Sequence, residues 1–192
     1  SSTWTYHRKA RAYYFHRFYD FQPDLNIDHP QVQEEVRRIM GFWLQLGVSG
    51  FRMDAVPFVI QKKGPIQRHP EQFRILQGLR SFLQWRTGDA IILGEANVLP
   101  KEDRQYFGDE ADRMHMMFNF QVNQNLFYAL ASADTRPLVK ALDATKPRPA
   151  TGQWGMFLRN HDELDLGRLT PAQRQRVFDA FGPRRCFWGT DV

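Results

Sequence analysis

Apolar residues along the chain follow two kinds of pattern. One kind favours helices and covers the stretches near residues 29–46, 70–86, 102–107, 121–132, 137–143 and 170–182. The other is a short, mostly apolar run, typical of a buried strand, near residues 48–53, 90–94, 114–119 and 154–158. Strand-like runs therefore alternate with helical stretches. This alternation predicts the α/β class with a parallel sheet.

Residues that begin and end helices agree with these boundaries. Asp28 is predicted to cap the first helix, because Gln31 three residues later completes a capping-box pattern. Gly47 suits the end of that helix. Thr170 and Gln173 repeat the capping pattern at the last helix.

The first twenty residues are rich in aromatic side chains, namely Trp4, Tyr6, Tyr13, Tyr14, Phe15, Phe18 and Tyr19. Aromatic residues bury large areas when they find a partner. We therefore expect this ribbon to pack on a neighbouring layer. The alternative is that it forms an aromatic surface facing a sugar.

Three of the strand-like runs end on or beside a carboxylate: Asp54, Glu95 and Asp162. The carboxyl ends of parallel strands meet at one edge of a sheet, where barrels and doubly wound folds keep their chemistry. Arg52 lies two residues before Asp54, so both side chains of an extended strand point the same way. The guanidinium favours the ionised form of Asp54, which a nucleophile requires.

Each carboxylate taken alone has a simpler structural explanation. Arg52 and Asp54 would form a salt bridge, Glu95 would accept a backbone hydrogen bond, and residues 160–162 would form a turn. Their joint occurrence, in this order and with helices between them, favours a catalytic set instead. His115 lies among methionines and is expected to be a histidine at the edge of the core.

Four short segments resemble segments of the α-amylase family of glycoside hydrolases and transglycosylases: QPDLN at 22–26, GFRMDA at 50–55, GEAN at 94–97 and FLRNHDE at 157–163. The residues of these segments look most like those of the trehalose synthase branch of that family. The resemblance implies that Asp54 is the nucleophile, Glu95 the general acid/base and Asp162 the transition-state stabiliser. It adds Arg52 and His161 as substrate-binding residues.

The resemblance runs from about Trp4 to Gly182 and implies part of a (β/α)8 TIM barrel. With four strand-like runs, the chain would hold barrel strands four to seven. Residues 1–21 would end the insertion before the third barrel helix, 22–182 would form barrel units, and 183–192 would be a divergent tail. The family's Asp-x-x-x-Asn-His segment is absent from this sequence. We expect a fragment of a catalytic domain, with weak or no activity alone.

The activity that the resemblance implies is retaining α-glucosyl transfer, interconverting the disaccharides maltose and trehalose and releasing some glucose. Two alternatives stay open. One is an α-glucosidase that hydrolyses α-linked oligosaccharides. The other is a non-catalytic carbohydrate-binding or partner protein, should these residues be the whole chain.

A calcium ion is the one cofactor that the resemblance suggests, and no organic cofactor is expected. Asp24 would supply a carboxylate oxygen, and Phe58 and Val59 would supply main-chain oxygens. Gln61 stands where the family usually has a glutamate, and the loss of a charged ligand lowers affinity for calcium.

Composition and charge limit the binding partners and the cellular compartment that the sequence allows. The net charge is +5, but 26 basic residues are mixed with 21 acidic ones and form no basic stripe, which argues against nucleic-acid binding. No apolar run approaches the ~20 residues of a membrane span. The single cysteine, Cys186, fits a reducing compartment, so we predict a cytoplasmic protein.

Two segments are expected to lack helices and strands. Residues 58–69 are expected to be a loop, and residues 146–149 a connector within one domain. The oligomeric state is left open.

Overall fold

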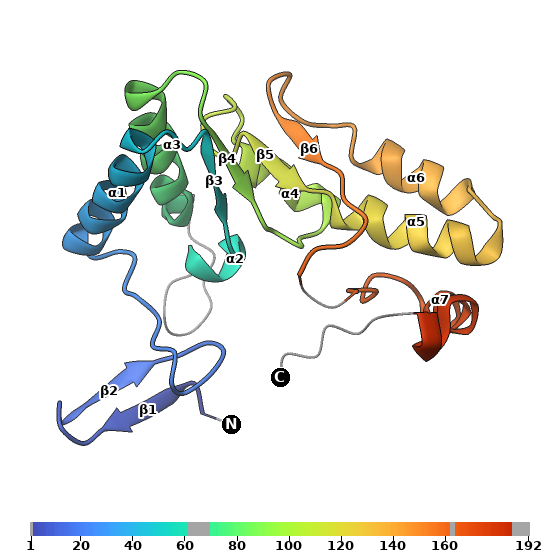
Figure 1. Ribbon diagram of the computed structural model, residues 1–192, viewed down its shortest axis with the longest axis horizontal. Coiled ribbons are helices and arrows are strands. Elements are labelled where there is room, and N and C mark those ends of the chain that lie inside the picture. Colours follow the sequence, from blue (N-terminus) through green and yellow to red (C-terminus); the bar gives the residue numbers. More distant parts are fainter. Residues whose placement is uncertain (1, 61–69, 162–163, 186–192) are drawn as a thin grey trace.

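The computed structural model describes residues 2–60, 70–161 and 164–185 as two sheets with helices around the larger one (Figure 1). The small sheet is an antiparallel hairpin of β1 (Trp4–His7) and β2 (Ala12–Phe15). The larger sheet is parallel, and its strands are β3 (Gly50–Met53), β4 (Ile91–Gly94), β5 (Met116–Phe118) and β6 (Gln153–Gly155). Their spatial order equals their chain order, β3-β4-β5-β6. The predicted α/β class and parallel sheet are confirmed.

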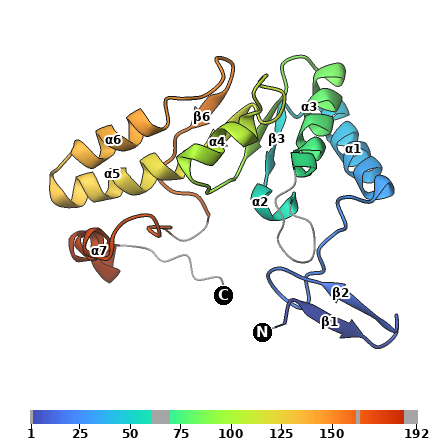
Figure 2. The same ribbon diagram turned by 180° about the vertical axis from the view of Figure 1, so that it is seen from behind.

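The described helices include six that fall within a few residues of their predicted positions and one, α2, that the sequence did not predict. They are α1 (Pro30–Gln45), α2 (Val56–Val59), α3 (Arg74–Arg86) after a 3-10 turn (Pro70–Phe73), α4 (Pro100–Phe107), α5 (Phe120–Ser132), α6 (Arg136–Ala144) and α7 (Pro171–Arg185). Figures 1 and 2 show α1 and α3 side by side next to β3, and α5 and α6 as an antiparallel pair beyond β6. Among the described helices, none has the length and apolar character needed to cross a membrane.

The main core lies between the parallel sheet and α3 and α4. Helix α3 buries Ile75, Leu76, Leu79 and Leu83, which share one face at helical spacing. Phe107 of α4 is fully buried and packs edge-on against Trp154 with ring centroids 5.2 Å apart. A second, smaller core joins α5 to α7 and contains Ala131, Leu166, Leu169 and Val177.

Two helix boundaries differ from the prediction. The cap of α1 is His29 rather than Asp28, because the Nδ1 atom of His29 accepts the Gln31 N–H at 3.2 Å and Pro30 occupies the first helical turn. The stretch expected to be a loop from residue 58 begins inside α2 instead. The remainder of that loop, residues 61–69, lies outside the described residues.

Other helix signals are confirmed. At α7, Thr170 Oγ1 accepts the Gln173 N–H at 3.3 Å, and Gln173 Oε1 accepts the Thr170 N–H at 3.0 Å. Gly47, just after α1, has φ 93°, a left-handed conformation that favours glycine. Gly182 interrupts α7 with φ 50°, in agreement with the predicted end of the regular helix.

The prediction for the aromatic ribbon is wrong for most of its residues. Tyr6 and Tyr13 are 48% and 67% exposed, and their rings pair with each other across the hairpin at 5.1 Å. In both views the hairpin lies apart from the parallel sheet. Its neighbouring segment reaches the main body through Phe18, whose ring meets that of Phe58 at 5.5 Å. In the part of the chain that the structure describes, the ribbon therefore pairs with itself rather than with a second layer.

The parallel sheet ends in two edge strands, β3 and β6, which agrees with part of a barrel. Within the described ranges, β3 pairs only with β4 and β6 only with β5. Helix α1, beside β3, also presents an exposed apolar face made of Ile39, Phe42, Trp43 and Leu46. Unpaired edges and exposed apolar faces favour association with further strands and helices.

We predict that Leu83→Ala lowers the free energy of unfolding by about 2–5 kcal/mol, the usual effect of truncating a buried leucine. Leu83 is fully buried on α3. Urea denaturation followed by circular dichroism measures the change. Trp85→Ala, on the same helix at a residue that is 90% exposed, is the control and should change stability little. Equal losses in the two variants would contradict the described packing of α3.

Candidate active site

The parallel pairing of β3 and β4 brings three of the predicted residues together. Arg52 lies on β3 opposite Leu93 of β4, and Glu95 follows the end of β4. The Glu95 N–H donates to Met53 O at 3.0 Å, and the Val56 N–H donates to Glu95 O at 3.0 Å. The main chain of Glu95 is thus held on both sides by the segment that carries Asp54.

The turn after β3 directs the site residues. Ala55 adopts a left-handed conformation, with φ 42°, where the chain passes from the strand into α2. This turn brings the Ala55 N–H to 3.5 Å from Glu95 Oε2. At the other end of the strand, a Cβ atom on Gly50 would lie 2.5 Å from Ile91 O, so only glycine permits this close approach of β3 and β4.

One arginine bridges the two carboxylates. Arg52 Nη1 lies 2.9 Å from Asp54 Oδ1, and Arg52 Nη2 lies 2.5 Å from Glu95 Oε2. The side chain of Glu95 is 13% exposed, whereas that of Asp54 is 70% exposed. Burial lowers the pKa of Arg52, but the charges and hydrogen bonds of Glu95 and Asp54 outweigh burial and raise it. Arg52 therefore stays cationic.

The two carboxyl groups have pKa values shifted in opposite directions. The hydrogen bond from Glu95 lowers the pKa of Asp54, and the charges of Arg52 and His161 lower it further, against the opposing effect of burial. Burial raises the pKa of Glu95, and the hydrogen bond to Asp54 adds to this, against the charge of Arg52. Asp54 therefore loses its proton more readily than an ordinary aspartate, and Glu95 holds its proton more strongly than an ordinary glutamate. Such divergence separates a nucleophile from a general acid.

The third predicted carboxylate is not placed. Asp162 lies outside the described residues. His161 is described and exposed, and its charge acts on Asp54. The structure thus brings together Arg52, Asp54, Glu95 and His161, and the role of Asp162 stays a prediction.

A polar cluster beside the site was not predicted from the sequence. The Arg168 Nε–H donates to Asn97 Oδ1 at 2.8 Å, and Asn97 donates to a carboxylate oxygen of Asp165. Asn97 follows Glu95 by two residues, so the cluster joins the segment after β4 to the segment after β6. The only sequence signal was the asparagine of GEAN, because the spacing between Asn97 and Arg168 is visible only in the fold.

The predicted calcium ligands do not make a complete site by themselves. Asp24 Oδ1 accepts the Arg17 N–H at 3.1 Å, and the Arg17 guanidinium lies over the Phe58 ring at 5.2 Å. Calcium takes six to eight oxygen ligands, several of them charged. Asp24 is the only carboxylate of the predicted set, and Gln61 lies outside the described residues. The described ranges also contain no group of three or more His, Cys, Asp and Glu side chains able to hold a metal.

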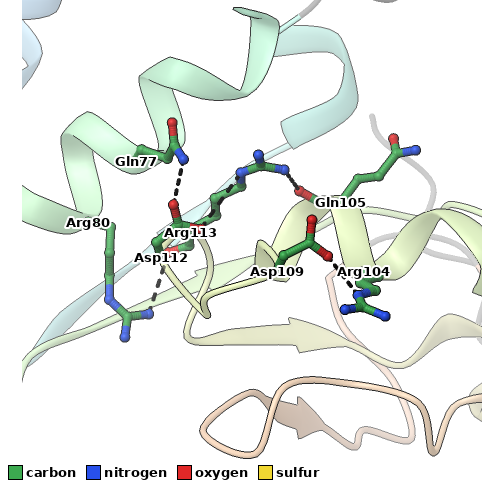
Figure 3. Close-up of polar contacts among 7 residues, drawn as sticks. All are labelled: Gln77, Arg80, Arg104, Gln105, Asp109, Asp112 and Arg113. Carbon is green, nitrogen blue, oxygen red and sulfur yellow. Dashed lines mark hydrogen bonds and ion pairs between the residues drawn. The ribbon is translucent and has the colours of Figure 1, made fainter. Parts of the chain in front are cut away.

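His115 has the predicted structural role. Its Nδ1 atom accepts the Ile92 N–H at 3.0 Å, and burial together with the nearby Arg80 charge lowers its pKa to about 4. Polar residues of α3, α4 and the loop between α4 and β5 form a separate cluster (Figure 3). In this cluster Gln77 donates to Asp112 at 2.5 Å, and Arg104 pairs with Asp109 at 2.7 Å. These contacts hold α3 and α4 to the loop and are structural.

Comparison with known proteins identifies relatives of the chain. The family described as "Alpha amylase, catalytic domain" matches residues 1–179. A trehalose synthase of Thermus thermophilus is 42% identical over 185 residues, which are 95% of this chain and 19% of that protein. An oligo-1,6-glucosidase of Bacillus cereus is 30% identical over 184 residues. The matched residues are 84% of this chain and 33% of the glucosidase.

A solved structure gives the same result for the fold. A trehalulose synthase superposes with a TM-score of 0.69 and 25% identity, over 98% of this chain and 35% of that protein. The parallel strands and helices are therefore part of a TIM-barrel catalytic domain, as predicted. The chain spans between about a fifth and a third of the length of these relatives.

We predict that Arg52→Met raises the pKa of both Asp54 and Glu95, because Arg52 lowers the pKa of each. Carbon-13 NMR of the side-chain carboxyl groups measures both titrations. Arg37→Met removes an exposed pair with Glu34 and is the matched control, which should leave both values unchanged. An unchanged Asp54 titration in Arg52→Met would contradict the bridge.

Proposed function

The chain belongs to the α-amylase family, and on that basis we propose that Asp54 and Glu95 are the nucleophile and the general acid/base of a retaining α-glucosyl transfer. One observation carries this proposal. Asp54 and Glu95 both pair with Arg52, and their pKa values are shifted in opposite directions. This divergence supports catalysis over a purely structural salt bridge, in which Arg52 would lower the pKa of both carboxyl groups.

The chemistry would proceed in two steps. Asp54 forms a bond to the anomeric carbon of a glucosyl unit while the glycosidic C–O bond breaks, and the proton of Glu95 passes to the leaving oxygen. A hydroxyl of the acceptor then gives its proton to Glu95, and its oxygen displaces Asp54 from the anomeric carbon. Retaining enzymes hold the two carboxyl groups ~5–5.5 Å apart.

We propose maltose and trehalose as the substrates. The identity to a trehalose synthase, 42%, exceeds the 30% identity to an oligo-1,6-glucosidase. Released glucose that re-attacks through its anomeric hydroxyl would convert maltose to trehalose. Attack by water would give glucose instead, so exclusion of water decides between the two outcomes. The similarity to the oligo-1,6-glucosidase supports α-glucosidase activity as the second candidate.

Product analysis on maltose tests this proposal. The assay uses the chain itself and a chimera in which the chain replaces the matching segment of the Thermus thermophilus trehalose synthase. We expect trehalose with minor glucose from the chimera, and little or no turnover from the chain alone. Glucose without trehalose would favour the α-glucosidase.

Glu95→Gln in the chimera should lower kcat by about 10²–10⁴-fold, the usual contribution of a general acid/base. Glu110→Gln, at an exposed position away from the site, is the matched control and should leave kcat unchanged. A chimera that folds and binds maltose without turnover would favour the non-catalytic binding protein. Full activity of Glu95→Gln would overturn the assignment.

A further inference from the structure

Glu95 is held firmly by β3 on one side, and a different set of contacts holds the segment that follows it. Asn97, two residues on, donates to a carboxylate oxygen of Asp165 and accepts from Arg168 Nε at 2.8 Å. Both partners belong to the segment between β6 and α7. Two loops that are far apart in the sequence therefore meet beside the general acid/base.

The segment that carries Arg168 is itself anchored at several points. Leu166 and Leu169 are 3% and 4% exposed and belong to the second core with α5 and α7. The Arg168 N–H donates to Oε1 of Gln124, a fully buried residue of α5, at 2.8 Å. The Gly167 N–H donates to Asp165 Oδ1 at 2.7 Å. Arg168 thus reaches Asn97 from a fixed base.

A buried acid on a third element, α4, is close enough to Arg168 for the two charges to interact. Asp103 of α4 is 6% exposed, and Arg168 is the opposite charge that acts on it. The other charged groups nearby are Glu102 on the same helix and Asp165 on Asn97. Burial outweighs the charge of Arg168 in setting the pKa of Asp103, so Asp103 loses stability when it ionises in place.

We propose that Arg168 is a positioning residue: anchored through Gln124 and the second core, its guanidinium fixes Asn97 and with it the loop that carries Glu95. Arg168 does not touch the reacting atoms. It acts by keeping the Glu95 carboxyl partly buried and aligned with Asp54. The consequence for catalysis rests on the proposed function, whereas the mechanical link does not.

The link has a pH dependence with a definite sign. Burial raises the pKa of Asp103 to about 7, against the opposing charge of Arg168. The ordinary pKa of an aspartate is lower, so as the pH rises through 7 the buried Asp103 ionises at a cost in stability that the unfolded chain does not bear. The Glu95 loop should therefore be held less tightly at pH 8 than at pH 6.

Amide hydrogen exchange tests the link without requiring activity. In Arg168→Met, the protection factors of Glu95, Val56 and Gly167 should fall about tenfold, because their hydrogen bonds border the loosened loops. Amides in the core of α3 should keep their protection. A general loss of stability would instead lower protection throughout the chain. Arg136→Met, which removes an arginine whose side chain is 89% exposed, is the control and should change none of these amides.

Two further variants sharpen the test. Arg168→Lys keeps a cationic donor and should restore most of the protection. Asp103→Asn keeps the size of the side chain but removes its titration, so protection at Glu95 should no longer differ between pH 6 and pH 8. Arg168→Met with protection at Glu95 equal to that of Arg136→Met would overturn the proposal, as would an unchanged pH dependence in Asp103→Asn.

The pKa of Glu95 shows whether the contact between Arg168 and Asn97 affects the proposed general acid/base. In Arg168→Met the Glu95 carboxyl should be less buried, so its pKa should fall toward that of an ordinary glutamate. A structural contact that left the loop in place would not move it. If the exchange and titration results hold but the chimera shows no turnover, the positioning stands and the proposed function fails.

Discussion

The site depends on the bridge that Arg52 makes between Asp54 and Glu95. A guanidinium presents its donors in a fixed plane, so it can hold two carboxyl groups at once and set their separation. The bridge forms only because β3 and β4 are parallel neighbours in register and their carboxyl ends meet. The hydrogen bond with Glu95 and the charge of Arg52 lower the pKa of Asp54, whereas burial raises that of Glu95. Fold and electrostatics are thus linked at one residue.

Two hydrophobic cores hold the segments that surround this bridge. Helices α3 and α4 bury the main core behind the strands, and α5 and α7 form a second core that anchors the segment after β6. The exposed edges of β3 and β6 and the apolar face of α1 agree with relatives several times longer than this chain. In those relatives, further strands and helices are available to cover such surfaces.

Most of the fold could be predicted from the sequence because apolar periodicity reports burial directly. All four parallel strands and the helices at 30–45, 74–86 and 120–132 lie close to where the pattern puts them. The errors have local causes. His29 replaces Asp28 as a cap because an imidazole nitrogen also accepts a main-chain N–H, and the hairpin rings pair with each other rather than with a layer. The Asn97–Arg168 contact joins loops that only the tertiary fold brings together, so no local pattern reveals it.

The most direct test of the account is to identify the residue that becomes glucosylated. A fluorinated α-glucosyl fluoride, whose covalent intermediate breaks down slowly, would be incubated with the chimera, and the digested protein analysed by mass spectrometry. We expect the added mass on the peptide that contains Asp54, and its loss in Asp54→Asn. Labelling of Glu95, or turnover of maltose without labelling of Asp54, would contradict the assignment.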